Sequence, residues 1–206
     1  EEKLSGATAN GDSKTINLTI DDDKNKGLFG RFIAGYGTDD RYESSLLFNY
    51  FKNDFKISVL GSSNNINSTG FSTNEIMDNM SGGRNSYSSW SSDGGFSING
   101  LDFSSNQGIF QTNMLGINYS DTWGKKNNVN GNYLFREVEN RNKNKSRIEN
   151  LLPENRYITE SESELRSKST KHTFNYEIEI AIDSLTTLSV IPKLERGISS
   201  SRTNGF

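Results

Sequence analysis

Apolar residues occupy every second position from Phe174 to Ile182. Successive side chains of an extended chain point to opposite faces, so these residues form one apolar face. Asn175, Glu177 and Glu179 form the polar face, whereas a helix would scatter both sets around its circumference. The pattern therefore predicts a β-strand. Similar alternation predicts further strands at residues 14–20, 28–37, 42–50, 55–61, 115–119, 129–135 and 188–194.

The connections between these strands have two lengths. Short turns are expected at residues 38–41, 52–54, 121–128 and 183–187, and long polar stretches cover residues 62–111 and 136–171. After the first hairpin, long and short connections alternate, so an up-and-down sheet places both long ones at one end. This asymmetry is typical of transmembrane barrels, which have short periplasmic turns and longer outside loops. Pro192 in the last segment fits a strand end or a bulge.

The first long stretch contains one helical signal and several aromatic residues. Ser72–Glu75 has the spacing of a capping box, and Ile76, Met77 and Met80 follow at near-helical spacing, which predicts a helix of about two turns. The aromatic residues farther along are Tyr87, Trp90, Phe96 and Phe103. Aromatic faces on a polar loop suit stacking against a sugar or peptide ligand. The alternative is that they pack the loop onto itself over the mouth of the barrel.

Composition narrows the choice of fold. Hydrophobic residues make up 31% of the 206 residues and the mean hydropathy is −0.74, which is low for a domain that must fill a solid core. Either the chain is largely disordered, or a thin apolar layer suffices, and the repeated alternation favours the layer. A transmembrane barrel needs apolar side chains only on its outer belt. No apolar run is long enough for a membrane-spanning helix.

These observations predict an all-β fold, an antiparallel up-and-down transmembrane β-barrel of which about seven strands are present, with long extracellular loops. Tyr42 and Tyr50 lie on one face at the spacing expected of two aromatic girdles. The expected lipid-facing residues are Phe32, Tyr36, Tyr42, Leu46, Phe48, Tyr50, Ile57, Val59, Leu115, Ile117, Tyr119, Tyr133, Phe135, Phe174, Tyr176, Ile178, Ile180 and Ile182.

Charge and reactive residues argue against several functions. A net charge of −3 gives no electrostatic case for nucleic acid, and the absence of cysteine excludes disulfides and thiolate metal sites. His172 has no second histidine to share a metal with, and Asp21–Asn25 departs from a calcium loop at its glycine and glutamate positions. Glu177 and Glu179 are expected to point the same way into the lumen, and nothing around them in the sequence indicates acid–base catalysis. We expect no metal, no cofactor and no enzymatic activity.

Several segments resemble one protein family. Leu28–Glu43, Ser62–Asn67 with Gly70–Ser72, Asn118–Trp123 and Asn144–Arg147 resemble the barrel of TonB-dependent-receptor-like outer-membrane proteins of the Bacteroidetes. Thr15–Ile20 resembles the closing strand of that family's plug. The resemblance implies that residues 1–26 are the C-terminal end of a plug domain with its linker, and that residues 27–206 are the N-terminal part of the barrel.

The resemblance also implies a place and a role. The chain would lie in the cell outer membrane, with lipid around it, and would help to bind and import an unknown nutrient ligand. The TonB system would act through the missing plug region. Family barrels have roughly 22 strands, so the chain reads as an internal fragment. Residues 199–205 do not alternate, and Phe206 reads as a truncation point. Two open sheet edges would make the isolated chain prone to aggregate.

Two alternatives remain at this stage. A soluble or surface-attached β-sandwich that binds glycans or matrix would turn the apolar rows toward each other across a closed interior. A small self-contained barrel would count residues 14–20 as an eighth strand. The orientation of the apolar rows separates the sandwich from both barrels.

Overall fold

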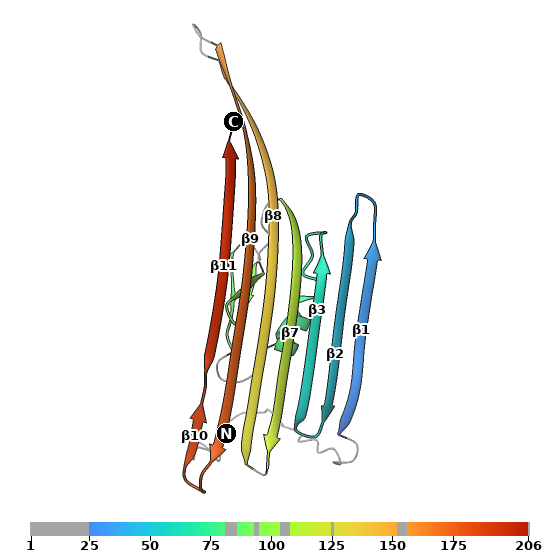
Figure 1. Cartoon of the computed structure of the whole chain (residues 1–206), viewed down its shortest axis with the longest axis vertical. Coiled ribbons are helices and arrows are strands. Elements are labelled where there is room, and N and C mark those ends of the chain that lie inside the picture. The colour runs from blue at the N-terminus through green and yellow to red at the C-terminus, as the bar shows by residue number, and fades with distance from the viewer. Residues whose placement is uncertain are drawn as a thin grey trace, which may run out of the picture.

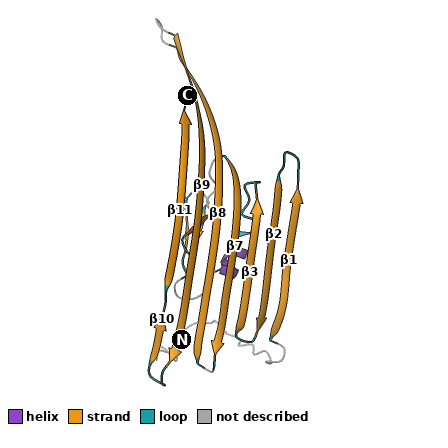
Figure 2. Ribbon diagram, viewed as in Figure 1, coloured by secondary structure: helices purple, strands orange, loops and turns teal. Residues whose placement is uncertain are grey.

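The computed structural model describes residues 25–80, 86–92, 95–103, 108–124, 126–151 and 156–205. The expected strand at residues 14–20, the plug remnant before residue 25 and Phe206 lie outside the described residues. The rest is almost entirely β-structure (Figures 1 and 2). The main sheet has eight strands, which are β1 (Lys26–Tyr36), β2 (Tyr42–Lys52), β3 (Phe55–Asn64), β7 (Ile109–Trp123), β8 (Asn127–Leu151), β9 (Arg156–Ala181), β10 (Thr187–Val190) and β11 (Lys193–Gly205).

The sheet is an antiparallel meander, as the alternation predicts. Its strand order is β1-β2-β3-β7-β8-β9, with β10 and β11 both paired to β9. From β1 to β10 every neighbour in space is also the next main-sheet strand along the chain, whereas β11 returns to pair with β9. Among the described residues the sheet does not close into a barrel, because β1 pairs with β2 alone and β10 and β11 pair with β9 alone.

β10 and β11 continue one another along the edge of β9. Val190 lies opposite Ile178 and Lys193 lies opposite Asn175, so the register is the same on both sides of Pro192. The carbonyl of Pro192 accepts a hydrogen bond from the backbone N–H of Tyr176 at 3.0 Å, but proline has no N–H to return. The strand is therefore interrupted at Pro192 by one missing donor rather than by a bulge.

The turns at one end of the sheet are short, as expected. Asn53 adopts a positive φ of 54° between β2 and β3, and only residues 124–126 separate β7 from β8. At the opposite end, Asp39 and Asp40 with φ of 56° and 55° make the tight turn between β1 and β2. Consecutive positive φ values match the right-handed twist of a hairpin, and aspartate tolerates them better than most residues.

The interpretation of residues 136–171 as a loop is wrong. β8 has 25 residues and β9 has 26, and together they form a hairpin that rises beyond the other strands (Figure 1). The expected end of the last strand near Leu194 is also wrong, since β11 continues to Gly205. The alternation in the hairpin is one of charge rather than of hydrophobicity. Lys143 and Lys145 reach Glu162 at 2.5 and 3.0 Å, and Arg147 reaches Glu160 at 3.5 Å.

The two faces of the sheet differ in what covers them. We call the face that carries the expected lipid-facing residues the outward face, and the opposite one the inward face. The strand register places all of the expected lipid-facing residues on the outward face, and none of them is buried. Phe32 is 71% exposed and Ile182 is 63% exposed. The apolar rows therefore do not face each other across a closed interior.

Residues 65–108, which we call the insertion, connect β3 to β7, and the described parts of the insertion lie against the inward face (Figure 2). They contain α2 (Thr73–Met80) and a small antiparallel sheet of β4 (Ser88–Trp90), β5 (Phe96–Ile98) and β6 (Leu101–Phe103). The predicted capping box is confirmed. The Ser72 hydroxyl accepts a hydrogen bond from the N–H of Glu75 at 3.2 Å, and the Glu75 carboxylate accepts one from the N–H of Ser72 at 2.9 Å.

One row of the inward face receives the helix. Leu47, Leu60, Gly116 and Leu134 lie directly opposite one another on β2, β3, β7 and β8. Met80 of α2 fills the space above Gly116, where a Cβ atom would come within 2.5 Å of the Met80 sulfur. Because these side chains are buried together, the hydrophobic core lies between the sheet and the insertion rather than within the sheet.

Candidate ligand cavity on the inward face

Asparagine side chains fasten both ends of the insertion to the sheet. Fully buried Asn64 donates to the carbonyl of Ser68 at 2.9 Å and accepts from its N–H at 3.2 Å. Asn67 accepts from the N–H of Phe110 at 2.8 Å and donates to the carbonyl of Gly108 at 2.8 Å. These contacts form a neck that holds the first and last residues of the insertion together and directs the chain between them over the inward face.

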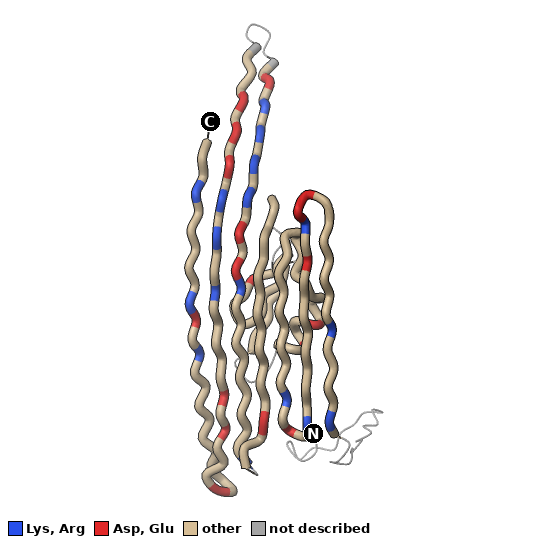
Figure 3. The backbone as a smooth tube through the Cα atoms, turned by 45° about the vertical axis from the view of Figure 1, so that its right-hand side comes forward, with Lys and Arg blue, Asp and Glu red and all other residues tan. Residues whose placement is uncertain are grey.

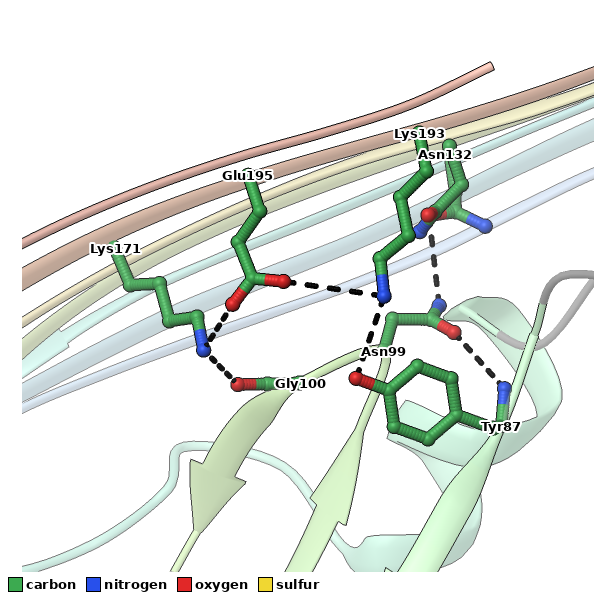
Figure 4. A network of polar contacts seen from close by, with 8 residues as sticks. Tyr87, Asn99, Gly100, Asn132, Lys171, Lys193 and Glu195 are labelled. Carbon is green, nitrogen blue, oxygen red and sulfur yellow. Dashed lines mark hydrogen bonds and ion pairs between the residues drawn. The ribbon is translucent and has the colours of Figure 1, made fainter. Parts of the chain in front are cut away.

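The tip of the β5–β6 hairpin is fixed on β8 and β9 (Figure 4). Asn99 and Gly100 form the turn, with φ of 50° and 81°. Buried Asn99 donates to Met80 O at 3.2 Å and to Oδ1 of Asn132 at 3.4 Å, and its own Oδ1 accepts from the N–H of Tyr87 at 3.2 Å. Asn175 donates to the same Asn132 oxygen at 2.9 Å. The turn of the hairpin is therefore hydrogen-bonded to Asn132, which is itself hydrogen-bonded to Asn175.

Two lysines and a glutamate hold the other side of the tip. Lys171 donates to the carbonyl of Gly100 and forms an ion pair of 2.6 Å with Glu195. Lys193 lies 3.8 Å from the second Glu195 oxygen and 4.6 Å from the centre of the Tyr87 ring. Figure 4 shows these side chains converging on the hairpin from β9 and β11. The insertion is thus bound to β9 and β11 at the Gly100 turn and at Tyr87, just before β4.

A cavity of about 530 Å³ remains between the hairpin, the neck and the inward face of β7, β8 and β9. Its volume lies within the range of pockets that bind small ligands. The walls combine aromatic rings with hydroxyl, amide and cationic groups. Residues that contribute such groups to the walls include Phe96, Phe103, Phe110, Arg136, Asn140 and Lys171.

Arg136 is the most constrained polar group of this cavity. Its guanidinium lies 4.9 Å from the centre of the Phe103 ring and donates from Nη1 to the carbonyl of Asp102. Its Nε atom is buried without a hydrogen-bond partner, as is Oδ1 of Asn140, four residues along the same strand and on the same face. A buried unsatisfied donor and acceptor are costly. A ligand with hydroxyl groups could satisfy both, because a hydroxyl accepts from an N–H and donates to an amide oxygen.

The four loop aromatics divide into two groups. Phe96 and Phe103 are buried, stack on each other at 4.8 Å and line the cavity. Trp90 is 67% exposed and packs its ring 5.7 Å from that of Phe96, on the side away from the cavity lining. Tyr87 lies beside Lys193 and supports the hairpin. Only Phe96 and Phe103 are placed to contact a ligand in this cavity.

The other residues weighed from the sequence lie elsewhere. His172 is on the outward face, where its Nδ1 is 2.9 Å from the hydroxyl of Tyr133. Glu177 is buried on the inward face of β9, and Glu179 follows it toward the short turns. Within the described ranges, no group of three or more His, Asp or Glu side chains is arranged to hold a metal ion. The cavity is therefore built for hydrogen bonding and ring contacts.

Sequence reasoning missed Arg136, Lys171 and the Asn99–Gly100 turn. The turn has a strong signal, because Asn-Gly between two short apolar segments is the commonest signature of a tight hairpin. Arg136 and Lys171 lie directly opposite each other on β8 and β9, but this becomes visible only when residues 136–171 are read as strands.

No helix in the described part of the chain has the length and apolar character needed to cross a membrane. The comparisons with known proteins add no assignment: no family model matches the chain, and neither a curated protein nor a solved structure gives a significant match.

Proposed function

We propose that this chain forms part of the wall of an outer-membrane β-barrel receptor, with its outward face in lipid and its insertion in the lumen. The receptor would bind a nutrient ligand and import it with energy from the TonB system. The support comes from three features of the sheet: an uncovered apolar band, an inward face that is polar outside the apolar surface on which the insertion packs, and a cavity built by the insertion.

The course of the apolar band carries the proposal. On β1 the outward apolar positions run from Leu28 to Tyr36, centred on Phe32, and on β9 they run from Phe174 to Ile182, centred on Ile178. The hydrogen-bonded row through Phe32 reaches β9 at His172. The band centre therefore shifts from residue 172 to residue 178 over the five steps from β1 to β9, or about one residue per strand.

This shift has a direct geometric meaning. With roughly 3.4 Å per residue along a strand and 4.8 Å between strands, a level band implies strands tilted by about 40°. Strands of transmembrane barrels are tilted by roughly 35–45°. An apolar band that covers a sandwich core has no reason to cross the strands at that angle. The oblique band is therefore what we expect of a sheet that stands in a bilayer.

The band has a distinct upper edge on β2, β3, β7 and β8. In the row through Phe32 the outward positions on β1, β2, β3, β7 and β8 are Phe, Leu, Gly, Leu and Phe. Two residues farther along, the row contains Ser44, Ser63, Asn113 and Glu137 on β2, β3, β7 and β8, whereas Ala34, Tyr36 and Tyr42 extend the band at the β1–β2 hairpin. Above this boundary the outward face of β8 and β9 carries the charged pairs of the long hairpin (Figure 3). Such a step from apolar to charged is expected where strands leave the hydrocarbon layer.

Fluorescence quenching in membranes tests the proposal. The chain has no cysteine, so single cysteines can carry a bimane label. Ile117→Cys lies in the band and Gln111→Cys lies on the same strand and face beyond it. In an outer-membrane fraction, lipids that carry a quencher near the bilayer centre should reduce the fluorescence of bimane at position 117 several times more than that of bimane at position 111. Equal quenching at both sites, or a chain found only in soluble fractions, would overturn it and favour the sandwich.

A further inference from the structure

A row of three arginines crosses the outward face above the apolar band. Arg141 on β8 lies directly opposite Arg166 on β9, and Arg166 lies directly opposite Arg202 on β11. Directly opposite residues on neighbouring strands project to the same face with Cβ atoms about 5 Å apart. All three side chains are exposed. Like charges in this position repel, and arginine cannot lose its charge to relieve the repulsion.

The surrounding acids do not balance this row. Glu139 forms an ion pair with Lys168 at 2.8 Å, and Glu164 forms an ion pair with Arg166 at 2.7 Å. In the described part of the chain, no carboxylate lies within ion-pair distance of Arg141 or Arg202. Elsewhere on the hairpin the cations do have partners, for example Lys143 with Glu162 at 2.5 Å. The arginine row is therefore an exception within a hairpin whose charges are otherwise matched.

The same residues line a concavity of about 660 Å³ on the outward face. Its charged lining residues are Arg141, Arg166, Lys168, Arg202 and Glu139, so four cations face one carboxylate. Each guanidinium offers several N–H donors in a planar fork that matches the oxygens of a phosphate group. Three forks spaced over about 10 Å suit a compact polyanion.

The neighbouring rows argue against a long polyanion. Glu139 lies in the row on one side of the arginines, and Glu164 lies in the row on the other side. A nucleic acid that followed the strands would pass both carboxylates and then the further acids of the long hairpin. A compact group bound within the row would lie beside Glu139 and would compete with Glu164 for Arg166. The surroundings of the row therefore favour a compact anion over a long one.

We propose that Arg141, Arg166 and Arg202 form a binding site for a compact phosphate-bearing group on a saccharide. This site is separate from the inward cavity and does not depend on it. Arg141 lies six residues beyond Phe135, the last apolar outward residue of β8. At roughly 3.4 Å per residue and a tilt of about 40°, that places it about 15 Å above the apolar band. A lipid-attached phosphate at that height needs an extended sugar headgroup rather than a phospholipid headgroup.

The test uses the full chain extracted in mild detergent from the cells that make it. Inorganic pyrophosphate is titrated at constant ionic strength, with chloride as the reference anion. The Arg166→Gln and Arg202→Gln variants should each bind pyrophosphate about tenfold more weakly than the unaltered chain. Lys143→Gln, which removes an ion-paired cation from the same face, should leave the affinity unchanged. A second arm compares micelles that contain a glycolipid phosphorylated on an extended sugar headgroup with micelles in which these phosphates have been removed.

Each outcome is decisive. Binding of pyrophosphate and of phosphorylated glycolipid assigns the site to a lipid headgroup, and binding of pyrophosphate alone assigns it to a soluble phosphosaccharide. No preference of pyrophosphate over chloride, or an equal loss with Lys143→Gln, overturns the proposal. Arg202→Gln relieves like-charge repulsion without breaking an ion pair that the structure shows, so without ligand this variant should melt no lower than the unaltered chain. Pyrophosphate binding can be measured even if the chain does not enter membranes. Failure of the arginine-site proposal can therefore be distinguished from failure of the barrel proposal.

Discussion

The side-chain oxygen of Asn67 accepts a hydrogen bond of 2.8 Å from the backbone N–H of Phe110, across 43 positions of the sequence. Asn67 also adopts a positive φ of 60°, which asparagine tolerates better than alanine. Asn67→Ala removes two hydrogen bonds and adds backbone strain, so it should weaken the docking of the insertion by about 1–3 kcal/mol. Limited proteolysis should then cut within residues 65–108 faster. Asn74→Ala, at an exposed position of α2, is the control, and equal cleavage of both variants would contradict the role of the neck.

Two glycines of the sheet should respond in opposite ways to valine. A Cβ atom at Gly116 would meet the Met80 sulfur at 2.5 Å and Leu134 at 3.2 Å, whereas Gly61 has open space on the outward face. Gly116→Val should displace α2 and destabilise the docked insertion by about 1–3 kcal/mol. Gly61→Val should be neutral or slightly stabilising. Tryptic cleavage within residues 65–108 reports both effects. Equal tolerance at the two positions would mean that the helix does not pack on this row.

The barrel proposal predicts a cost of charge that depends on depth. Ile117 lies within the apolar band, and Asn113 lies four residues away on the same face, beyond the band boundary. Ile117→Arg should destabilise the membrane-inserted chain by about 2–4 kcal/mol, whereas Asn113→Arg should cost about 1 kcal/mol or less. The amount of each variant in outer-membrane fractions, compared at equal synthesis, measures the difference. A larger loss for Asn113→Arg would be incompatible with a lipid boundary between the two positions.

The capping box predicts a pH dependence for the insertion. A hydrogen bond from the backbone of Ser72, supported by an ion pair of 2.7 Å with Arg31, lowers the pKa of Glu75 below its ordinary value of 4.5. A carboxylate with a lowered folded-state pKa contributes stability that is complete above the unfolded pKa and is lost as the pH falls through the folded pKa. The docking of α2 should therefore weaken below about pH 4.5. In the Glu75→Gln variant the docking of α2 should be weaker at pH 7, and the rate of proteolysis should not rise further as the pH falls below about 4.5.

A charge reversal tests the pairing of the long hairpin. The Glu162 carboxylate lies between Lys143 and Lys145, and these contacts lower its pKa. Lys143→Glu would place acids beside Glu162 and should increase hydrogen exchange at the amides of residues 141–150. Adding Glu162→Lys restores an opposite-charge pair with residue 143 and should recover most of the protection. If the double variant exchanges as fast as the single variant, the pair does not stabilise the hairpin.

The sequence predicts the strands whose outward residues are apolar, and the reason is the period of two. From β1 to β3 the expected and observed strands agree within a few residues, because apolar residues recur at every second position and tight turns separate them. Hydrophobic alternation does not identify the upper parts of β8 and β9 as strands, because charged residues alternate there with neutral polar residues. Asn140, Asn142 and Asn144 alternate with Arg141 and Lys143, and this pattern does not register on a hydropathy scale.

The position of the insertion could not be predicted from local patterns. Leu47, Leu60 and Leu134 look like isolated faults in the alternation of three separate strands. Only the register brings them into one row, where they form the surface on which α2 packs. The cavity depends on the same long-range geometry, because Arg136 and Phe103 come from the sheet and the insertion respectively. The residues of this site can be read from a single sequence, but the strand register that brings them together cannot.

The oblique apolar band has a consequence for the barrel that we propose. The average displacement of about one residue per strand sets the inclination of the strands, so further strands with the same average displacement would lengthen the circumference without changing that inclination. Barrels of quite different diameter could therefore share this geometry. The diameter of the lumen would then depend on strand number, whereas the length of the apolar stretch on each strand would set the thickness of membrane that the wall fits.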